Sequence, residues 1–106
     1  MITHKTRRES YMNILKNLGT RQSQVFAELL TFSQGATASE LASHMHDIGF
    51  FRSADRNNTH PRLNEMTELG IVEVIGKRQC LITGKTVAVY KVNDYAYRLL
   101  FEEVVN

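Results

Sequence analysis

The first half of the chain repeats apolar residues at the three- and four-residue spacing of an amphipathic helix. Between Arg8 and Leu18 the apolar positions fall on one side, and Gly19 then ends the pattern. A second run begins at Thr20, which can cap a helix, and continues to Gly35. Its broad apolar stripe consists of Val25, Phe26, Leu29, Leu30 and Phe32. We therefore predict two amphipathic helices that bury these stripes in a core.

The third predicted helix has the clearest start signal in the chain. Thr37 and Glu40 have the spacing of a capping box, in which each side chain accepts a hydrogen bond from the other residue's amide. The apolar positions that follow are Leu41, Ala42, Met45 and Ile48. The small Ala42 would let another helix cross closely, and Gly49 is the expected end.

A polar stretch from Arg52 to Asn58 leads into a fourth predicted helix. One side of this helix should face the core, because it repeats Thr59, Leu63, Met66 and then Leu69 or Gly70. Gly70 marks the end of the pattern. Pro61 has no amide hydrogen and is tolerated in the first turn of a helix but not in its interior. We therefore place the start between Asp55 and Thr59.

Strand-forming residues dominate the region after Gly70. They are Ile71, Val72, Val74 and Ile75, followed by the run from Thr86 to Val92, and the sequence Thr-Gly-Lys at positions 83–85 supplies a turn between the two runs. We predict an antiparallel hairpin. Asp94 can then cap a short helix, whose apolar stripe consists of Tyr97, Leu100, Phe101 and Val104.

Length and composition suit one domain that spans residues 1–106. The 106 residues are 42% hydrophobic, enough for a core without disulfides or a metal. The lone Cys80 cannot form an internal disulfide, and no N-terminal apolar run resembles a signal peptide or a membrane span. We expect a mainly helical α+β protein in the cytoplasm, with no membrane partner and no cofactor.

Three segments resemble winged helix-turn-helix DNA-binding domains. They are Thr37 to Ala42, Pro61 to Met66, and Leu69 to Val72. In the last two, a leucine, a large apolar residue, a glycine and two aliphatic residues are similar to the family's exit from recognition helix to wing. Residues 77–80 and 83–85, together with Tyr90, are more narrowly similar to small winged-helix proteins of bacteriophages and prophages.

The resemblance covers about residues 20–92 and implies a winged-helix core with the β-hairpin as its wing. The predicted helices at 8–18 and 94–105 would flank this core. The connection from Met45 to Asn58 is longer than the usual tight turn of the family. It contains Phe50 and Phe51, which puts the angle of the recognition helix in question.

The resemblance to this family implies sequence-specific binding of double-stranded DNA, and the phage likeness implies a transcriptional regulator. The recognition helix would enter the major groove. The residues opposite its core side are Asn57, His60, Pro61 and Asn64, with Asn58 and Glu65 beside them. Asparagine can read adenine through two hydrogen bonds, and His60 can donate to a base or a phosphate.

Two of the candidate positions have a structural alternative. Asn58 is at least as well placed to cap the helix as to contact a base. Arg62 borders the apolar stripe, so its guanidinium can reach a phosphate or pair with Glu65 or Glu68. The sequence leaves both alternatives open.

The formal net charge of +2 is too small by itself to indicate a polyanion partner. The distribution is uneven, however, because the segment from Val74 to Asn93 contains no acidic residue. We expect Lys77, Arg78 and Lys85, which lie near the turn, to contact phosphates or the minor groove. Such contacts supply affinity more than sequence preference.

No constellation of residues predicts catalysis or a metal site. His44 and His46 are two positions apart on a helix and point to different sides, and Cys80 lacks the neighbours of a nucleophile. We therefore expect that the protein is not an enzyme and binds no metal.

A second interpretation is a winged-helix module for protein–protein contact or an accessory role in replication. The adjacent Phe50 and Phe51 and the apolar stripes of the terminal helices favour it, unless all of them pack on the same core. A mixed interpretation is a homodimer, in which the terminal helices pair two copies. Each copy would then offer a recognition helix to a half-site about one DNA turn from the other.

Overall fold

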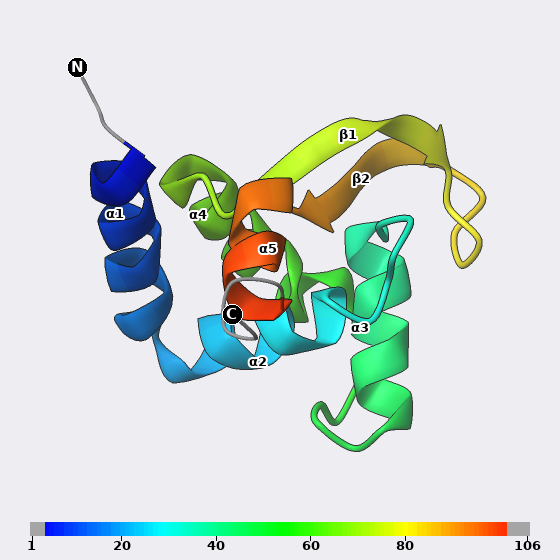
Figure 1. The fold of residues 1–106 in the computed structure, drawn as a ribbon. Helices are drawn as coiled ribbons and strands as arrows, with labels where there is room; N and C mark the ends of the chain where they lie inside the picture. Colours follow the sequence, from blue (N-terminus) through cyan, green and yellow to red (C-terminus); the bar gives the residue numbers. More distant parts are fainter. Residues whose placement is uncertain (1–3, 102–106) are drawn as a thin grey trace.

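The computed structural model describes residues 4–101, which form five α-helices, one 3-10 turn and one two-stranded sheet (Figure 1). In chain order the elements are α1 (His4–Lys16), α2 (Thr20–Leu29), α3 (Ala38–Asp47), η1 (Arg56–Asn58), α4 (His60–Leu69), β1 (Val72–Gln79), β2 (Thr86–Val92) and α5 (Asp94–Phe101). This part of the chain is therefore an α+β fold that is mainly helical, as the sequence predicted.

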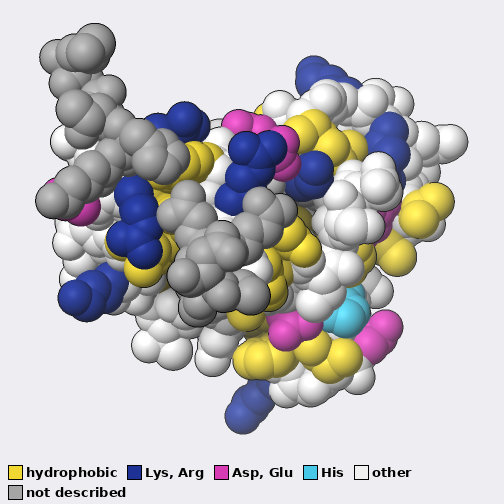
Figure 2. All heavy atoms as spheres, viewed as in Figure 1, with side chains coloured by type: hydrophobic (Ala, Val, Ile, Leu, Met, Phe, Trp, Pro, Cys, Tyr) yellow, Lys and Arg dark blue, Asp and Glu magenta, His cyan; other side chains and the backbone are white. Residues whose placement is uncertain are grey.

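The hairpin of β1 and β2 lies along the helices, and its tip projects at the end of the molecule opposite α1 (Figure 1). α4 packs on α2 and β1, while β2 contacts both α2 and α3. α1 contacts α5. Seen from the same side, hydrophobic side chains are exposed where the hairpin tip lies (Figure 2).

One cluster of buried side chains joins α2, α3, α4, the hairpin and α5. Its members include Val25, Leu29, Leu41, Met45, Leu63, Met66, Ile71, Val72, Val92 and Ala96. Thr59, Leu63 and Met66 are all completely buried, which confirms the predicted core side of α4 for its first two turns. At the end of the helix the prediction is wrong for Leu69, which is 42% exposed. Ala42 is buried as well, whereas Ile48 at the end of α3 is half exposed. Burial of a leucine side chain such as that of Leu63 contributes about 2 kcal/mol to stability.

The capping box at the start of α3 is confirmed. Thr37 Oγ1 accepts a hydrogen bond from the Glu40 amide at 3.1 Å, and Glu40 Oε1 accepts one from the Thr37 amide at 3.2 Å. The predicted ends of α3 and α4 are confirmed too. Gly49 and Gly70 have φ angles of 91° and 87°, in the left-handed region that favours glycine.

Two predicted helix starts are wrong by one residue. α2 is capped by Gly19 rather than by Thr20, since the Gln22 side chain accepts a hydrogen bond from the Gly19 amide at 2.9 Å. α4 begins at His60, just after the predicted range, because the residues before it form η1 instead. Pro61 then lies in the first turn, where its missing amide hydrogen leaves no helical bond unmade.

α5 differs from its prediction in both its cap and its buried face. Asn93 Oδ1 accepts hydrogen bonds from the Tyr95 and Ala96 amides at 2.9 and 3.1 Å, so Asn93 caps α5 in place of Asp94. The buried side chains are Tyr95, Ala96 and Leu99. Tyr97 and Phe101 are half exposed instead, with their ring centroids 4.6 Å apart. The predicted apolar Val104 lies outside the described residues.

The two terminal helices pack on the same core as the rest of the described chain. α1 extends from His4 to Lys16, so it starts and ends earlier than the predicted helix at 8–18. Tyr11 of α1 meets Tyr95 of α5 edge to face, with ring centroids 4.9 Å apart. The Arg7 guanidinium lies 4.1 Å from the centre of the Tyr95 ring. The Tyr11 hydroxyl donates a hydrogen bond to the Gly70 carbonyl at 3.4 Å.

β1 and β2 pair antiparallel, as predicted, and Lys77 lies directly opposite Ala88. The segment that connects α2 to α3 pairs with β2 through a single bridge. In this bridge Ala36 and Tyr90 exchange two backbone hydrogen bonds of 2.8 and 2.9 Å. The neighbouring Gly35 has a φ of 83°, and a Cβ atom there would lie 2.7 Å from the Tyr90 carbonyl oxygen. This close approach requires glycine.

Candidate nucleic-acid interface

The first turn of α4 is fixed to α3 by Thr59. The Thr59 hydroxyl donates a hydrogen bond to the Ala38 carbonyl at 2.7 Å, and the side chain is completely buried. With this side anchored, α4 turns its opposite side outward. Of the residues predicted to face a DNA groove, His60, Pro61 and Asn64 lie on α4 and are exposed or half-buried, whereas Asn57 lies in η1 and is exposed.

Asn64 joins the outward side of α4 to the hairpin. Its Oδ1 atom accepts a hydrogen bond from the Tyr90 hydroxyl of β2 at 3.0 Å, and its Nδ2 atom lies 3.4 Å from His60 Nε2. Burial raises the pKa of Tyr90, so the phenol stays protonated and remains a donor at neutral pH. The polar side of α4 and strand β2 therefore lie next to each other.

A small pocket of ≈ 50 Å³ lies where the first residues of α3 and α4 meet β2. Its lining consists of Ala38, Ser39, Arg56, His60, Val87, Ala88 and Tyr90. Burial, assisted by the charge of Arg56, lowers the pKa of His60, so the imidazole is neutral at pH 7 and has one donor and one acceptor nitrogen. Arg56 was not among the predicted site residues. The signal that pointed to it is the stretch 52–62, where Asp55 alone opposes three arginines.

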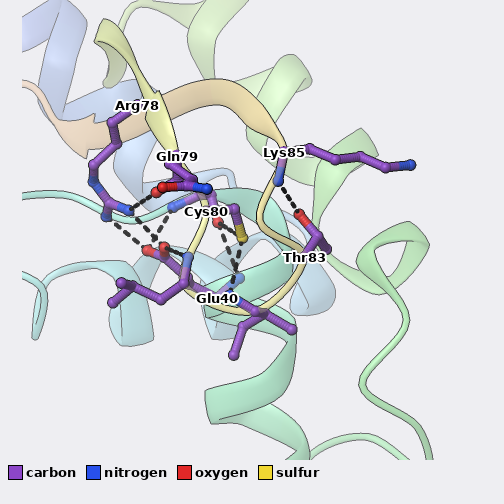
Figure 3. A network of polar contacts seen from close by, with 9 residues as sticks. Glu40, Arg78, Gln79, Cys80, Thr83 and Lys85 are labelled. Atoms are coloured by element: carbon purple, nitrogen blue, oxygen red, sulfur yellow. Dashed lines mark hydrogen bonds and ion pairs between the residues drawn. The ribbon is translucent and has the colours of Figure 1, made fainter.

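Lys77 lies on the α4 side of the hairpin. It is exposed and directly opposite Ala88, and the side chains of directly opposed residues project from the same face of a sheet. Ala88 and Tyr90 are two positions apart on β2 and so share this face, from which Tyr90 reaches Asn64. Lys85 is exposed near the tip, and its side chain extends away from Glu40 and Arg78 (Figure 3).

Arg78 faces the other side of the hairpin. Its Nη1 and Nη2 atoms donate to the two carboxylate oxygens of Glu40 at 2.6 and 2.7 Å (Figure 3). The Glu40 side chain is 8% exposed and that of Arg78 is 40% exposed. The structure thus separates Arg78 from Lys77, because the Arg78 guanidinium fastens the hairpin to α3 instead of adding charge beside α4.

The Glu40 carboxylate accepts four hydrogen bonds. Besides the two from Arg78, it accepts one from the Thr37 amide at 3.2 Å and one from the Leu81 amide at 2.9 Å. The hydrogen bonds from Arg78 and from the two amides outweigh the effect of burial and lower the pKa of Glu40 to about 2. The buried Cys80 lies beside this group, with its Sγ atom 3.1 Å from Thr37 Oγ1. The hairpin tip is therefore fixed to the start of α3.

Two other predicted DNA contacts have partners within the protein. Arg62 Nη2 donates to Glu65 Oε2 at 2.8 Å, so the ion-pair alternative is the one observed. The other oxygen of Glu65 accepts a hydrogen bond from Gln22 of α2 at 3.0 Å. Asn58 Nδ2 donates to the backbone oxygen of Ser53 at 3.1 Å. Arg62 and Asn58 thus stabilise the position of α4 and of the loop before it.

The two histidines of α3 have separate partners. His44 Nε2 lies 2.9 Å from Glu28 Oε1, and His46 Nδ1 lies 3.0 Å from the Phe51 carbonyl oxygen. Among the side chains that the structure describes, at residues 6–101, no three histidine, cysteine, aspartate or glutamate side chains are grouped so that they could hold a metal ion. None of the helices in this range has the length and apolar character to cross a membrane.

A comparison with protein-family models finds no match for this sequence, and comparisons with curated proteins and with solved structures find none either. The surface that α4 and the hairpin form together is therefore the main guide to function.

Proposed function

We propose that this protein is a winged-helix domain that binds double-stranded DNA sequence-specifically and regulates transcription in a phage or prophage. In this proposal α4 enters the major groove and the hairpin lies on the phosphate backbone. The order of α2, α3, α4 and hairpin is compatible with this fold, and the bridge between Ala36 and Tyr90 adds a third segment to the sheet. The regulatory role rests on the sequence likeness at positions 77–80 and 83–85.

The observation that carries the proposal is the shared orientation of two polar surfaces. The hydrogen bond from Tyr90 to Asn64 holds the outward side of α4 beside β2, and Lys77 projects from the same face of the hairpin. A duplex that lies against this side would meet the polar residues of α4 and the cation of the hairpin together. Phosphate contacts then position the protein while base contacts give it sequence preference.

The side chains of this surface divide into three roles. Contacts to base edges would come from Asn57, His60 and Asn64. Contacts to phosphates would come from Arg56, Lys77 and Lys85. Positioning roles would belong to Asn58, Arg62 and Arg78, which are held by partners within the protein. Amides and imidazoles suit the donor and acceptor pattern of the major groove, whereas cations suit phosphates of any sequence.

The proposal is tested by selecting bound sequences from random duplex DNA with the full chain at physiological salt. Enrichment of a motif supports the proposal. A motif with two-fold symmetry would also support a homodimer that presents two copies of α4 to half-sites about one DNA turn apart. Absence of a motif, together with absence of duplex binding at low salt, would overturn the proposal.

One observation favours a second function, which is contact with another protein. Ile48 and Phe50, in the connection between α3 and α4, are both about half exposed. Phe51 is buried instead, and the Arg21 guanidinium lies 4.7 Å from the centre of its ring. A module for protein contact or a replication accessory would use the exposed pair. Under this function the selection from random duplexes yields no motif, and loss of Lys77 leaves any DNA affinity unchanged.

A further inference from the structure

Two aliphatic side chains project at the tip of the hairpin. Leu81 is 86% exposed and Ile82 is 56% exposed. Among the large hydrophobic side chains of residues 4–101, that of Leu81 is the most exposed. Contiguous exposed apolar side chains commonly mark a surface that is covered by a partner. The hairpin tip therefore requires an explanation that phosphate contact by its lysines does not supply.

The backbone of the tip is fixed although its aliphatic side chains point outward. The Leu81 amide donates to Glu40 Oε2 at 2.9 Å, which attaches the tip to α3. The Cys80 amide donates to the Lys85 carbonyl at 2.8 Å, and the Gly84 amide donates to the Cys80 carbonyl at 2.9 Å, which closes the loop. A loop that is ordered beforehand loses little conformational entropy when it inserts into a partner.

The charge around the tip selects the partner. Lys77 precedes the tip and Lys85 follows it along the chain, both are exposed, and no acidic residue lies between positions 74 and 93. Glu40, the acidic residue that touches the tip, is neutralised by Arg78. The tip thus combines exposed aliphatic side chains with a positively charged surrounding sequence. This combination complements duplex DNA, in which apolar base faces lie between two rows of phosphates.

We infer that Leu81 and Ile82 form a wedge that enters the minor groove of DNA, partly unstacks one base step and bends the duplex. Aliphatic side chains inserted from the minor groove kink DNA, most easily at flexible steps such as TpA. The minor groove is about 6 Å wide, so it admits the tip of a loop but not a whole two-stranded ribbon. The inference rests on the proposed DNA binding and deepens it, since it makes the partner a duplex that the protein deforms.

The test uses the full chain and a duplex of about 30 base pairs that contains TpA steps and carries a donor and an acceptor dye at its two ends. Binding of the wild type should raise energy transfer, because bending brings the ends together. The variant Leu81→Ser/Ile82→Ser should lose most of this rise and bind about tenfold more weakly. Its slope of log affinity against log salt should not change, because no phosphate contact is removed.

Two matched variants separate the wedge from the charges. Leu81→Met/Ile82→Leu keeps the tip apolar and should keep the bend. Lys77→Ala/Lys85→Ala should reduce the salt slope but leave the energy transfer of the saturated complex unchanged. A 2-aminopurine base at the central TpA step should brighten when the wild type binds, because unstacking relieves its quenching. This last measurement does not depend on any variant.

The outcomes distinguish failure of the wedge from failure of the proposed function. Equal energy transfer in saturated complexes of the wild type and the serine variant, or no brightening of 2-aminopurine, would overturn the wedge and leave DNA binding intact. No binding of the duplex by the wild type at low salt would overturn both. A change in oligomeric state of the serine variant, with bending unchanged, would assign the tip to contact between protein chains and also overturn the wedge.

Discussion

The substitution Glu40→Gln removes the negative charge that fastens the hairpin tip to α3. The pKa of this carboxyl falls from its ordinary value of 4.5 to about 2 in the folded protein. A shift of this size corresponds to about 3 kcal/mol of stability at neutral pH, at about 1.4 kcal/mol for each pKa unit. The Arg78 guanidinium is 40% exposed, so water screens part of the interaction, and glutamine keeps an oxygen that accepts one amide hydrogen. We therefore expect the free energy of unfolding to fall by about 2 kcal/mol.

The pH dependence of this loss follows from the direction of the shift. A carboxyl whose pKa is lowered by folding stabilises the protein fully above its unfolded pKa of 4.5. The stabilisation is lost as the pH falls from there toward the folded pKa of about 2. The stability difference between wild type and Glu40→Gln should therefore be constant from about pH 7 to about pH 5.5 and shrink below about pH 4.5.

Urea unfolding followed by far-ultraviolet circular dichroism measures both effects. The control Glu68→Gln removes the same charge from the exposed side of α4 and should change stability by less than about 0.5 kcal/mol. Adding Arg78→Gln to Glu40→Gln should cost little more, which in a double-mutant cycle gives a coupling energy of about 1 to 3 kcal/mol. A loss at neutral pH no larger than that of the control, or a loss that persists undiminished at about pH 3, would refute the reasoning.

Three further predictions concern DNA binding and backbone conformation. Lys77→Ala/Lys85→Ala should weaken binding to every duplex and reduce the salt slope by about 0.9 for each lost phosphate contact, measured by fluorescence anisotropy; an unchanged slope would contradict the phosphate role. Asn57→Ala should change which sequence is preferred in competition assays with base-substituted duplexes, and an equal loss on all of them would argue against base contact. Gly35→Ala should destabilise the fold by about 1 to 3 kcal/mol more than Gly49→Ala in urea. Both positions have a positive φ, but a Cβ meets the β2 backbone at the first and nothing within 4 Å at the second, so equal losses would exclude the steric cause.

The fold was predicted well where the signals are local. The capping box of Thr37 and Glu40 spans one helical turn, and the core side of α4 follows from the spacing of its apolar residues. The cap of α5 was assigned to the wrong neighbour, because Asn93 and Asp94 have equally suitable side chains. Only the path of the chain at the end of β2 decides between such adjacent candidates.

The site was predicted less completely, because its contacts join distant segments. Arg78 and Glu40 are 38 positions apart, and no local pattern pairs them. One part was accessible from the sequence, however. Neighbouring residues on a strand point to opposite faces, so Lys77 and Arg78 could not both lie on the face that meets α4. The tertiary bond between Asn64 and Tyr90 could be found only from the structure.

That bond presets the way in which Asn64 would meet a base. An asparagine amide can rotate by half a turn, which exchanges its oxygen and its nitrogen with little change in shape. Here the phenol of Tyr90 holds the oxygen on the β2 side, which leaves the nitrogen toward His60. A carbonyl oxygen has two lone pairs, so it can accept a hydrogen from adenine while it keeps the one from Tyr90. The free protein would then already fix which side of the Asn64 amide accepts a hydrogen bond from adenine and which side donates one.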